Sequence, residues 1–137
     1  MTTKKVLLVS AAMLIDDENR VFLQQRPAGK SMAGLWEFPG GKVEADETPE
    51  EALSRELAEE LSIKTSPTDF HPLTFASHGY HDFHLLMPVF TCRIWAGRMT
   101  AIEGQKTAWV PADQLTDYRM PPADEPLLPA LRQELAR

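Results

Sequence analysis

The sequence predicts a mixed α/β (α+β) sandwich formed by a single domain that spans residues 1–137. Two observations indicate this class. Apolar, strand-like runs lie on both sides of a strongly amphipathic helical segment, and a second amphipathic segment closes the chain. A chain of 137 residues is long enough to bury roughly two thirds of its surface around one core.

The N-terminal part is expected to form two strands. Residues 6–15 and residues 21–25 are apolar runs, and the polar residues between them are typical of a turn. This pattern predicts a hairpin in which the second run pairs with the first. Lys4 and Lys5 ahead of the first run also resemble the start of a secretory signal, but the hairpin pattern favours a strand. No run reaches the about 20 apolar residues of a membrane span, so no membrane partner is expected.

A helix is predicted over Pro49–Leu61. Thr48 and Glu51 have the spacing of a capping box, and a proline occupies the first helical position, where its missing N–H is not needed. Apolar residues recur on one face of this helix, so that face is expected to pack on the core. They are Leu53, Leu57 and Leu61.

The same helix gathers three carboxylates within about one turn: Glu56, Glu59 and Glu60. Like charges at this spacing repel by about 0.2–0.5 kcal/mol per pair, and Arg55 is the near neighbour that offsets the repulsion. Mg²⁺ prefers carboxylate oxygens and keeps waters and phosphates as its other ligands, so a bound cation would turn the repulsion into attraction. A solvated acidic helix face is the alternative that this composition allows.

The remaining segments are predicted from turn residues and apolar runs. Loops or turns are expected at residues 26–34, 39–41 and 121–126. Strands are expected at residues 35–38, 73–80, 84–95 and 107–110, with a helical turn at 111–115 and a closing helix at 127–136.

Composition and charge limit the classes of function. With 43% hydrophobic and 25% charged residues, the composition is that of an ordinary globular protein. The net charge of −6 argues against binding to a nucleic acid polymer. It also means that action on polyphosphates needs metal ions to supply positive charge. Cys92 is the single cysteine, so no internal disulfide is expected and a reducing, cytoplasmic location fits.

The spacing of the charged residues resembles the Nudix box of hydrolases that act on nucleoside diphosphate linkages. The matching residues are Gly41, Glu47, Arg55, Glu56, Leu57, Glu59, Glu60 and Ile63. One position departs from the family pattern, because Ser62 stands where the family has Gly. A helix often ends there in the left-handed conformation, so Ser is expected to cost about 1 kcal/mol in stability without removing a ligand. The resemblance implies a mixed β-sheet between α-helices.

The resemblance also implies roles for these residues. Glu56 is implied as a metal ligand or as the general base, while Arg55 holds the catalytic carboxylates and Glu47 orders the loop before the helix. For Arg55 and Glu47 the alternative is a surface ion pair worth at most about 1 kcal/mol. The implied ligands of Mg²⁺, or of Mn²⁺ in its place, are the Gly40 carbonyl, Glu56, Glu59, Glu60 and, as in MutT-type members, Glu103.

Three further stretches resemble the MutT branch of the family, whose members clear oxidised guanine nucleotides: residues 35–42, 103–105 and 121–126. Asp124 stands where the best-known members have an Asn that reads the purine edge. A carboxylate accepts hydrogen bonds from both N1–H and the N2 amino group of 8-oxoguanine. The N4 amino group of cytosine is also a donor, so CTP or 5-substituted cytosine nucleotides are the alternative substrates.

Other expected contacts to the nucleotide are Arg26, Phe38, Tyr80 and Phe83. Core packing is the alternative for Phe38 and for one of the other two aromatic residues.

The sequence therefore supports the hypothesis of a cytoplasmic, Mg²⁺-dependent nucleoside triphosphate pyrophosphohydrolase. It would act on 8-oxo-dGTP and prevent mutation in DNA replication and repair, as a monomer or homodimer. A non-catalytic nucleotide-binding module is one alternative, which the complete set of acidic residues disfavours. A zinc site formed by His71, His78, His81 and His84 is another, disfavoured because structural zinc sites normally use cysteine pairs.

Overall fold

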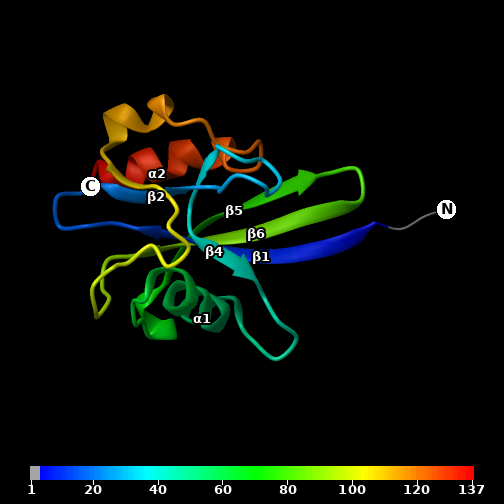
Figure 1. The fold of residues 1–137 in the computed structure, drawn as a ribbon, viewed down its shortest axis with the longest axis horizontal. Coiled ribbons are helices and arrows are strands. Elements are labelled where there is room, and N and C mark those ends of the chain that lie inside the picture. The colour runs from blue at the N-terminus through cyan, green and yellow to red at the C-terminus, as the bar shows by residue number, and fades with distance from the viewer. Residues whose placement is uncertain (1–3) are drawn as a thin grey trace.

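The computed structural model describes residues 4–137, which form two β-sheets and two α-helices (Figure 1). The strands are β1 (Lys5–Leu14), β2 (Val21–Gln25), β3 (Trp36–Glu37), β4 (Gly40–Lys42), β5 (His71–Gly79), β6 (Phe83–Cys92) and β7 (Thr107–Val110). The helices are α1 (Pro49–Leu61) and α2 (Leu128–Leu135), with 3₁₀ turns at Pro67–Asp69, Ala112–Asp117 and Glu125–Leu127.

Strand β1 lies inside a four-stranded mixed sheet of order β4-β1-β6-β5. It runs parallel to β6 and antiparallel to β4, where Ser10 is paired with Gly41. Strand β5 pairs antiparallel with β6 and forms the far edge of the sheet. Both edges of β1 are therefore occupied.

The second sheet is antiparallel, with the order β3-β2-β7. The expected hairpin between residues 6–15 and 21–25 is therefore wrong beyond its turn. A bridge between Ile15 and Val21 and a 3.0 Å bond from the Asp16 N–H to the Arg20 carbonyl join the two strands at that turn. The pairing does not continue because β4 and β6 take the two edges of β1, which leaves β2 to pair with β3 and β7.

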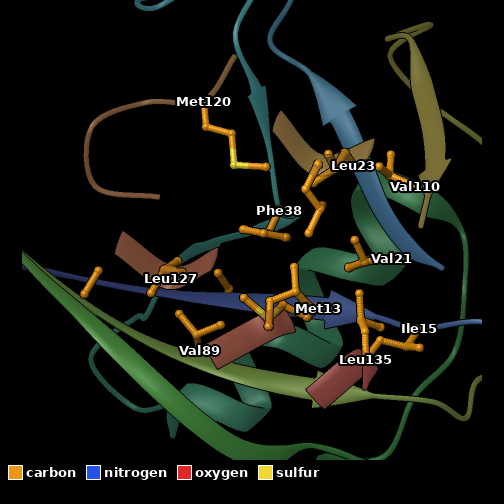
Figure 2. Close-up of a cluster of buried hydrophobic side chains, with 14 of the residues drawn as sticks. Met13, Ile15, Val21, Leu23, Phe38, Val89, Val110, Met120, Leu127 and Leu135 are labelled. Atoms are coloured by element: carbon orange, nitrogen blue, oxygen red, sulfur yellow. The ribbon is translucent and has the colours of Figure 1, made fainter. Parts of the chain in front are cut away.

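Two apolar clusters cover the two faces of β1. Met13 and Ile15 pack with residues of β2 and α2, among them Leu135 (Figure 2). Ala12 and Leu14 point to the opposite face and pack against the leucine stripe of α1. Successive side chains of a strand alternate between its faces, so burial on both sides explains the continuous apolar run. The helices α1 and α2 thus lie on opposite faces of the four-stranded sheet, which confirms the predicted fold class (Figure 1).

Helix α1 has the predicted bounds and the predicted capping box. Thr48 Oγ1 accepts a hydrogen bond from the Glu51 N–H at 3.1 Å, and Glu51 Oε1 accepts one from the Thr48 N–H at 2.8 Å. Ser62 follows the helix in the left-handed conformation, with φ +60° and ψ 28°, and its N–H donates to the Ala58 carbonyl at 3.1 Å. Ser62 therefore adopts the conformation that favours glycine.

Residues 40 and 41, which belong to the turn predicted at 39–41, lie in strand β4 instead. The reason lies in how closely the chain approaches β1. A Cβ atom on Gly40 would lie 2.0 Å from the Ser10 carbonyl oxygen, so only glycine allows this approach. The two glycines therefore build a strand that packs directly beside β1.

The strands predicted at residues 21–25 and 107–110 have their predicted bounds, while other boundaries shift by a few residues. Strand β6 ends at Cys92 rather than at Trp95, and α2 begins at Leu128, after a 3₁₀ turn. The Cys92 thiol is fully buried, and this burial raises its pKa. Within residues 4–137, no helix combines the length and the apolar character that crossing a membrane requires.

Candidate active site

A cleft of about 240 Å³ gathers residues from both sheets, from α1 and from the loops between them. Its polar and charged lining comprises Ser10, Gln24, Gln25, Arg26, Lys30, Glu37, Lys42, Glu60, Glu103, Gln105 and Asp124. We call Gly40, Gly41, Glu56 and Glu60 the metal side of this site. We call Arg26, Glu37, Phe38 and Asp124 its base side.

Glu56 packs directly on the backbone of β4. A Cβ atom on Gly41 would lie 2.4 Å from Glu56 Cδ, so the carboxyl group occupies the space that any larger residue at position 41 would fill. The Glu56 side chain is 18% exposed. Burial raises the pKa of Glu56, while the hydrogen bond and the positive charge of Arg55 act in the opposite direction.

Arg55 connects Glu47, Glu56 and β4. Its Nε and Nη2 atoms donate to the two carboxylate oxygens of Glu47 at 2.6 and 2.9 Å, and Nη1 donates to Glu56 Oε1 at 2.9 Å. Nη2 also donates to the Lys42 carbonyl at 3.0 Å. The bonds from Arg55 and from the Glu44 N–H lower the pKa of Glu47 to about 2, and Glu47 raises the pKa of Arg55. Arg55 therefore fixes Glu56 relative to both the helix and the strand.

Glu60 lines the cleft one helical turn after Glu56 and is largely removed from water. Burial, followed by the negative charge of Glu56, raises the pKa of Glu60 to about 8, although the Gln24 side chain and the Gly40 backbone act in the opposite direction. Glu60 Oε2 is buried without a hydrogen-bond partner among the described residues. An unpartnered buried carboxylate oxygen is costly, and it is the kind of atom that a cation would stabilise.

The side chains of this structure do not form a complete metal cage. In the described part of the chain, no three carboxylate, imidazole or thiol groups lie close enough to hold a metal ion. Glu59 is 61% exposed and lies 3.6 Å from Arg55 Nη1, while Glu103 lies 3.7 Å from Lys30 Nζ. The donor set still fits a hard divalent cation, because Glu60 offers an unpartnered oxygen and the neighbouring donors are carboxylate and carbonyl oxygens.

On the base side, Asp124 is buried and lines the cleft. It precedes the 3₁₀ turn Glu125–Leu127, but its side chain makes no capping bond there. Burial and then the negative charge of Glu37 raise the pKa of Asp124 to about 7, while Arg26 acts in the opposite direction. Arg26 is itself held by a 2.9 Å bond to Glu37 Oε1 and a 2.7 Å bond to the Ser31 carbonyl.

The predicted aromatic contacts fall into two groups. Phe38 is buried in the core cluster (Figure 2). It also lines the cleft, so it serves both packing and the site. Tyr80 and Phe83 lie at the connection of β5 and β6, outside the cleft lining, with their rings stacked at 4.9 Å. Burial and the charge of Asp124 raise the pKa of Tyr80, so this ring lies within electrostatic reach of the base side.

Three of the histidines lie at the same connection, and each has another neighbour. His78 packs on Tyr80 at 4.7 Å, His84 is hydrogen-bonded to Ser77 at 2.7 Å, and His81 lies 2.8 Å from Asp82. These contacts account for the HGYHDFH segment without a shared ligand.

The cleft also contains residues that sequence reasoning missed. Glu37 holds Arg26, Lys30 pairs with Glu103, and Gln24 accepts a 3.1 Å hydrogen bond from Gln105. Gln24 and Ser10 are both buried polar residues inside otherwise apolar strands. Such interruptions of an apolar run are the signal that could have identified them.

Comparisons with known proteins agree with this geometry. Residues 10–130 match the family described as "NUDIX domain". The "8-oxo-dGTP diphosphatase" of Proteus vulgaris is 40% identical over 104 residues, which is 76% of this chain and 91% of that protein. The "CTP pyrophosphohydrolase" of Escherichia coli (strain K12) is 38% identical over 136 residues, which is 92% of this chain and 91% of that protein.

A solved structure, "Solution structure of the E. coli ORF135 protein", superimposes with a TM-score of 0.84. It is 34% identical, and the match covers 98% of this chain and 94% of that one. The family match extends over most of the chain, and its boundaries include β4, α1 and Asp124. The chain therefore belongs to the NUDIX domain family and is a Nudix hydrolase.

Proposed function

We propose that this Nudix hydrolase is a Mg²⁺-dependent nucleoside triphosphate pyrophosphohydrolase that converts a nucleoside triphosphate and water into the monophosphate and pyrophosphate. The observation that carries the proposal is the joining of two features in one site. The half-buried carboxylates of Glu56 and Glu60 stand beside two glycines on the metal side, and a buried carboxyl group, Asp124, stands on the base side. One side suits a polyphosphate chain with its cation, and the other suits a base.

On the metal side, Glu56 and Glu60 would hold the cation, together with the Gly40 carbonyl, with Glu59 and Glu103 as further predicted ligands. A divalent cation bound there supplies positive charge for the phosphates and lowers the pKa of a bound water. Mg²⁺ is the proposed ion, and Mn²⁺ would replace it. Arg55 keeps Glu56 against β4, where this carboxylate either binds the cation or accepts a proton from the attacking water.

On the base side, the proposed substrate is 8-oxo-dGTP. An ionised Asp124 accepts hydrogen bonds from N1–H and the N2 amino group of 8-oxoguanine. Phe38 supplies an apolar surface beside Asp124 in the same lining, and Arg26 lies within reach of the nucleotide. The similarity to the Proteus vulgaris "8-oxo-dGTP diphosphatase" supports this choice of base.

A cytosine nucleotide is the second candidate, because the pKa of Asp124 is raised to about 7. The neutral carboxyl group both donates and accepts a hydrogen bond, which complements N3 and the N4 amino group of cytosine. The similarity to the Escherichia coli "CTP pyrophosphohydrolase" supports this reading. We further propose that the enzyme works in the cytoplasm, as one domain spanning residues 1–137 and as a monomer or homodimer.

A substrate panel tests the proposal. We would measure kcat/KM for 8-oxo-dGTP, dGTP, CTP and a 5-substituted dCTP, with phosphate and pyrophosphate assayed separately, before and after removal of divalent cations by a chelator. We expect pyrophosphate as the product, loss of turnover after chelation, and preference for 8-oxo-dGTP. A preference for CTP of more than about tenfold, which is about 1.4 kcal/mol, would replace 8-oxo-dGTP by CTP. Release of phosphate in place of pyrophosphate would contradict the reaction class.

The pH dependence separates the two bases further. Ionised Asp124 favours 8-oxoguanine and neutral Asp124 favours cytosine, so the ratio of kcat/KM for 8-oxo-dGTP to that for CTP should rise between pH 6 and pH 8. A ratio divides out the effects of pH that both substrates share. A flat ratio would show that Asp124 does not read the base.

A further inference from the structure

Two buried side-chain oxygens in the described part of the chain have no hydrogen-bond partner: Glu60 Oε2 and Ser10 Oγ. Both residues line the same cleft. Glu60 is accounted for by its predicted role as a metal ligand, but nothing in the sequence motif accounts for Ser10. The pairing of two unsatisfied oxygens in one cleft requires an explanation that includes both.

The strand register shows which way the Ser10 side chain points. Ser10 pairs with Gly41 across the antiparallel β1–β4 ladder, and paired residues project to the same face of a sheet. The Glu56 carboxyl group occupies that face at Gly41, 2.4 Å from the position of a Cβ atom there. The hydroxyl of Ser10 therefore lies on the face of β1 that carries the α1 carboxylates.

The neighbouring positions of β1 confirm this orientation. Ala12 and Leu14, which share the face of Ser10, belong to the apolar cluster of the α1 leucines. Ser10 is the first residue on this face that lies beyond the cluster, and it lines the cleft. An alanine would fill the same space, and it would spare the protein the cost of an unsatisfied buried hydroxyl.

We propose that Ser10 is a positioning residue of the metal side: its hydroxyl donates a hydrogen bond to the Glu60 carboxylate, directly or through one water, when the enzyme holds its divalent cation. This inference rests on the proposed metal-dependent function. A hydroxyl donor orients a ligating carboxylate and is satisfied at the same time, so both unpartnered oxygens gain a partner in one step. Loss of such an outer partner typically weakens metal affinity about 10–100-fold.

The proposal predicts that the Ser10→Ala substitution stabilises the metal-free protein but weakens metal binding. In the metal-free protein, the substitution removes an unsatisfied polar atom, so the melting temperature should rise by about 4 °C. In the metal titration, Mn²⁺ should bind at least about tenfold more weakly. The metal concentration that gives half-maximal turnover should shift by the same factor, while kcat at saturating metal stays within about threefold of wild type.

The test uses the full chain stripped of metal by a chelator, with Mn²⁺ alone as the titrant in a calorimeter. Thr91→Val is the matched control, because Thr91 is a buried hydroxyl on β6 that lies outside the cleft lining. It should leave the dissociation constant of Mn²⁺ unchanged. Ser10→Cys keeps a weak donor of similar size, and its Mn²⁺ affinity should lie between those of wild type and Ser10→Ala.

A double substitution distinguishes positioning from general packing. If Ser10 acts through Glu60, then Ser10→Ala combined with Glu60→Gln should bind Mn²⁺ no more weakly than Glu60→Gln alone. Fully additive losses would overturn the proposal, as would a Ser10→Ala dissociation constant within about twofold of wild type. If the wild-type protein hydrolyses nucleotides and binds Mn²⁺, and the Ser10→Ala variant binds Mn²⁺ equally well, only the proposed role of Ser10 is wrong. If wild type binds no Mn²⁺, the proposed function fails as well.

Discussion

The metal side and the base side of the cleft are built from different parts of the fold. The metal side rests on a regular strand and a regular helix, joined by the bonds of Arg55 to Glu47, Glu56 and the Lys42 carbonyl. The base side takes Arg26 from the segment after β2 and Asp124 from the loop before α2. Asp124 is buried, but its side chain makes no capping hydrogen bond to the following 3₁₀ turn that would fix its rotamer.

This difference bears on the roles that we propose for the two sides. Helix and strand hold the carboxylates at fixed spacing, so chemistry that depends on that spacing varies little. Loops accept substitutions with little effect on the rest of the fold, so the choice of base changes more easily. The two named relatives fit this division, since both are nucleotide hydrolases but their names give different bases.

The largest effect is expected from Glu56→Gln on the metal side. The amide cannot accept a proton and is a poor ligand, so kcat should fall about 10²–10⁴-fold. The helix should stay folded, because the amide fits the same space beside Gly41. Steady-state turnover with Mg²⁺ and thermal melting measure both effects. Glu50→Gln, on the same helix, is the control and should keep its activity. If Glu56→Gln kept more than a tenth of the wild-type kcat, the catalytic centre would have to lie elsewhere.

Gly41→Ala tests whether the distance between strand and helix matters. The added Cβ atom would lie 2.4 Å from Glu56 Cδ, so the carboxyl group must move. We expect kcat to fall about 10–100-fold and the free energy of unfolding to fall by about 1–3 kcal/mol. Gly79→Ala is the matched control, since its Cβ atom would meet no atom closer than 3.8 Å. Equal activities of the two variants would contradict the proposed close packing of Glu56.

Asp124→Asn tests the base side through pH. The folded pKa of Asp124, about 7, lies above its ordinary value of 3.8, so the folded protein loses stability as pH rises between these values. The amide removes this loss. The melting temperature of the variant should therefore exceed that of wild type at pH 8 and match it at pH 4. The free energy of unfolding should rise by an amount on the order of 2–4 kcal/mol at pH 8.

The same variant should change base preference by up to about tenfold and leave Mn²⁺ affinity unchanged, because the metal side is untouched. Exposed Asp113 supplies the control: Asp113→Asn should leave both the base preference and the Mn²⁺ affinity unchanged. An equal loss of kcat/KM for all four nucleotides would show that Asp124 maintains the fold of the cleft and does not recognise the base.

The smallest effect is expected from Ser62→Gly. Ser62 has φ +60°, where glycine avoids the strain of a side chain, so the substitution should add about 1 kcal/mol to the free energy of unfolding. Activity should stay unchanged, since no metal-side atom moves. Ser54→Gly in the middle of α1 should have the opposite sign. A destabilised Ser62→Gly variant would show that the Ser62 side chain has a stabilising contact of its own.

The sequence predicted the metal side better than the base side for a physical reason. Capping signals and the leucine spacing placed α1 at its observed bounds, because they depend on residues close together in the chain. The pairing of β2 could not be predicted in this way, since it depends on which strands had already taken the edges of β1. Gln24 and Ser10 interrupt apolar runs, but only the meeting of distant segments in the cleft shows that these two residues and Glu37 line one site.

The burial of Cys92 has a consequence for the conditions in which the enzyme would work. Oxidants attack the thiolate, and this thiol is fully buried with a raised pKa. Oxidised guanine nucleotides accumulate when peroxides and radicals are abundant. The single sulfhydryl group of this protein is therefore shielded from the oxidants that generate its proposed substrate.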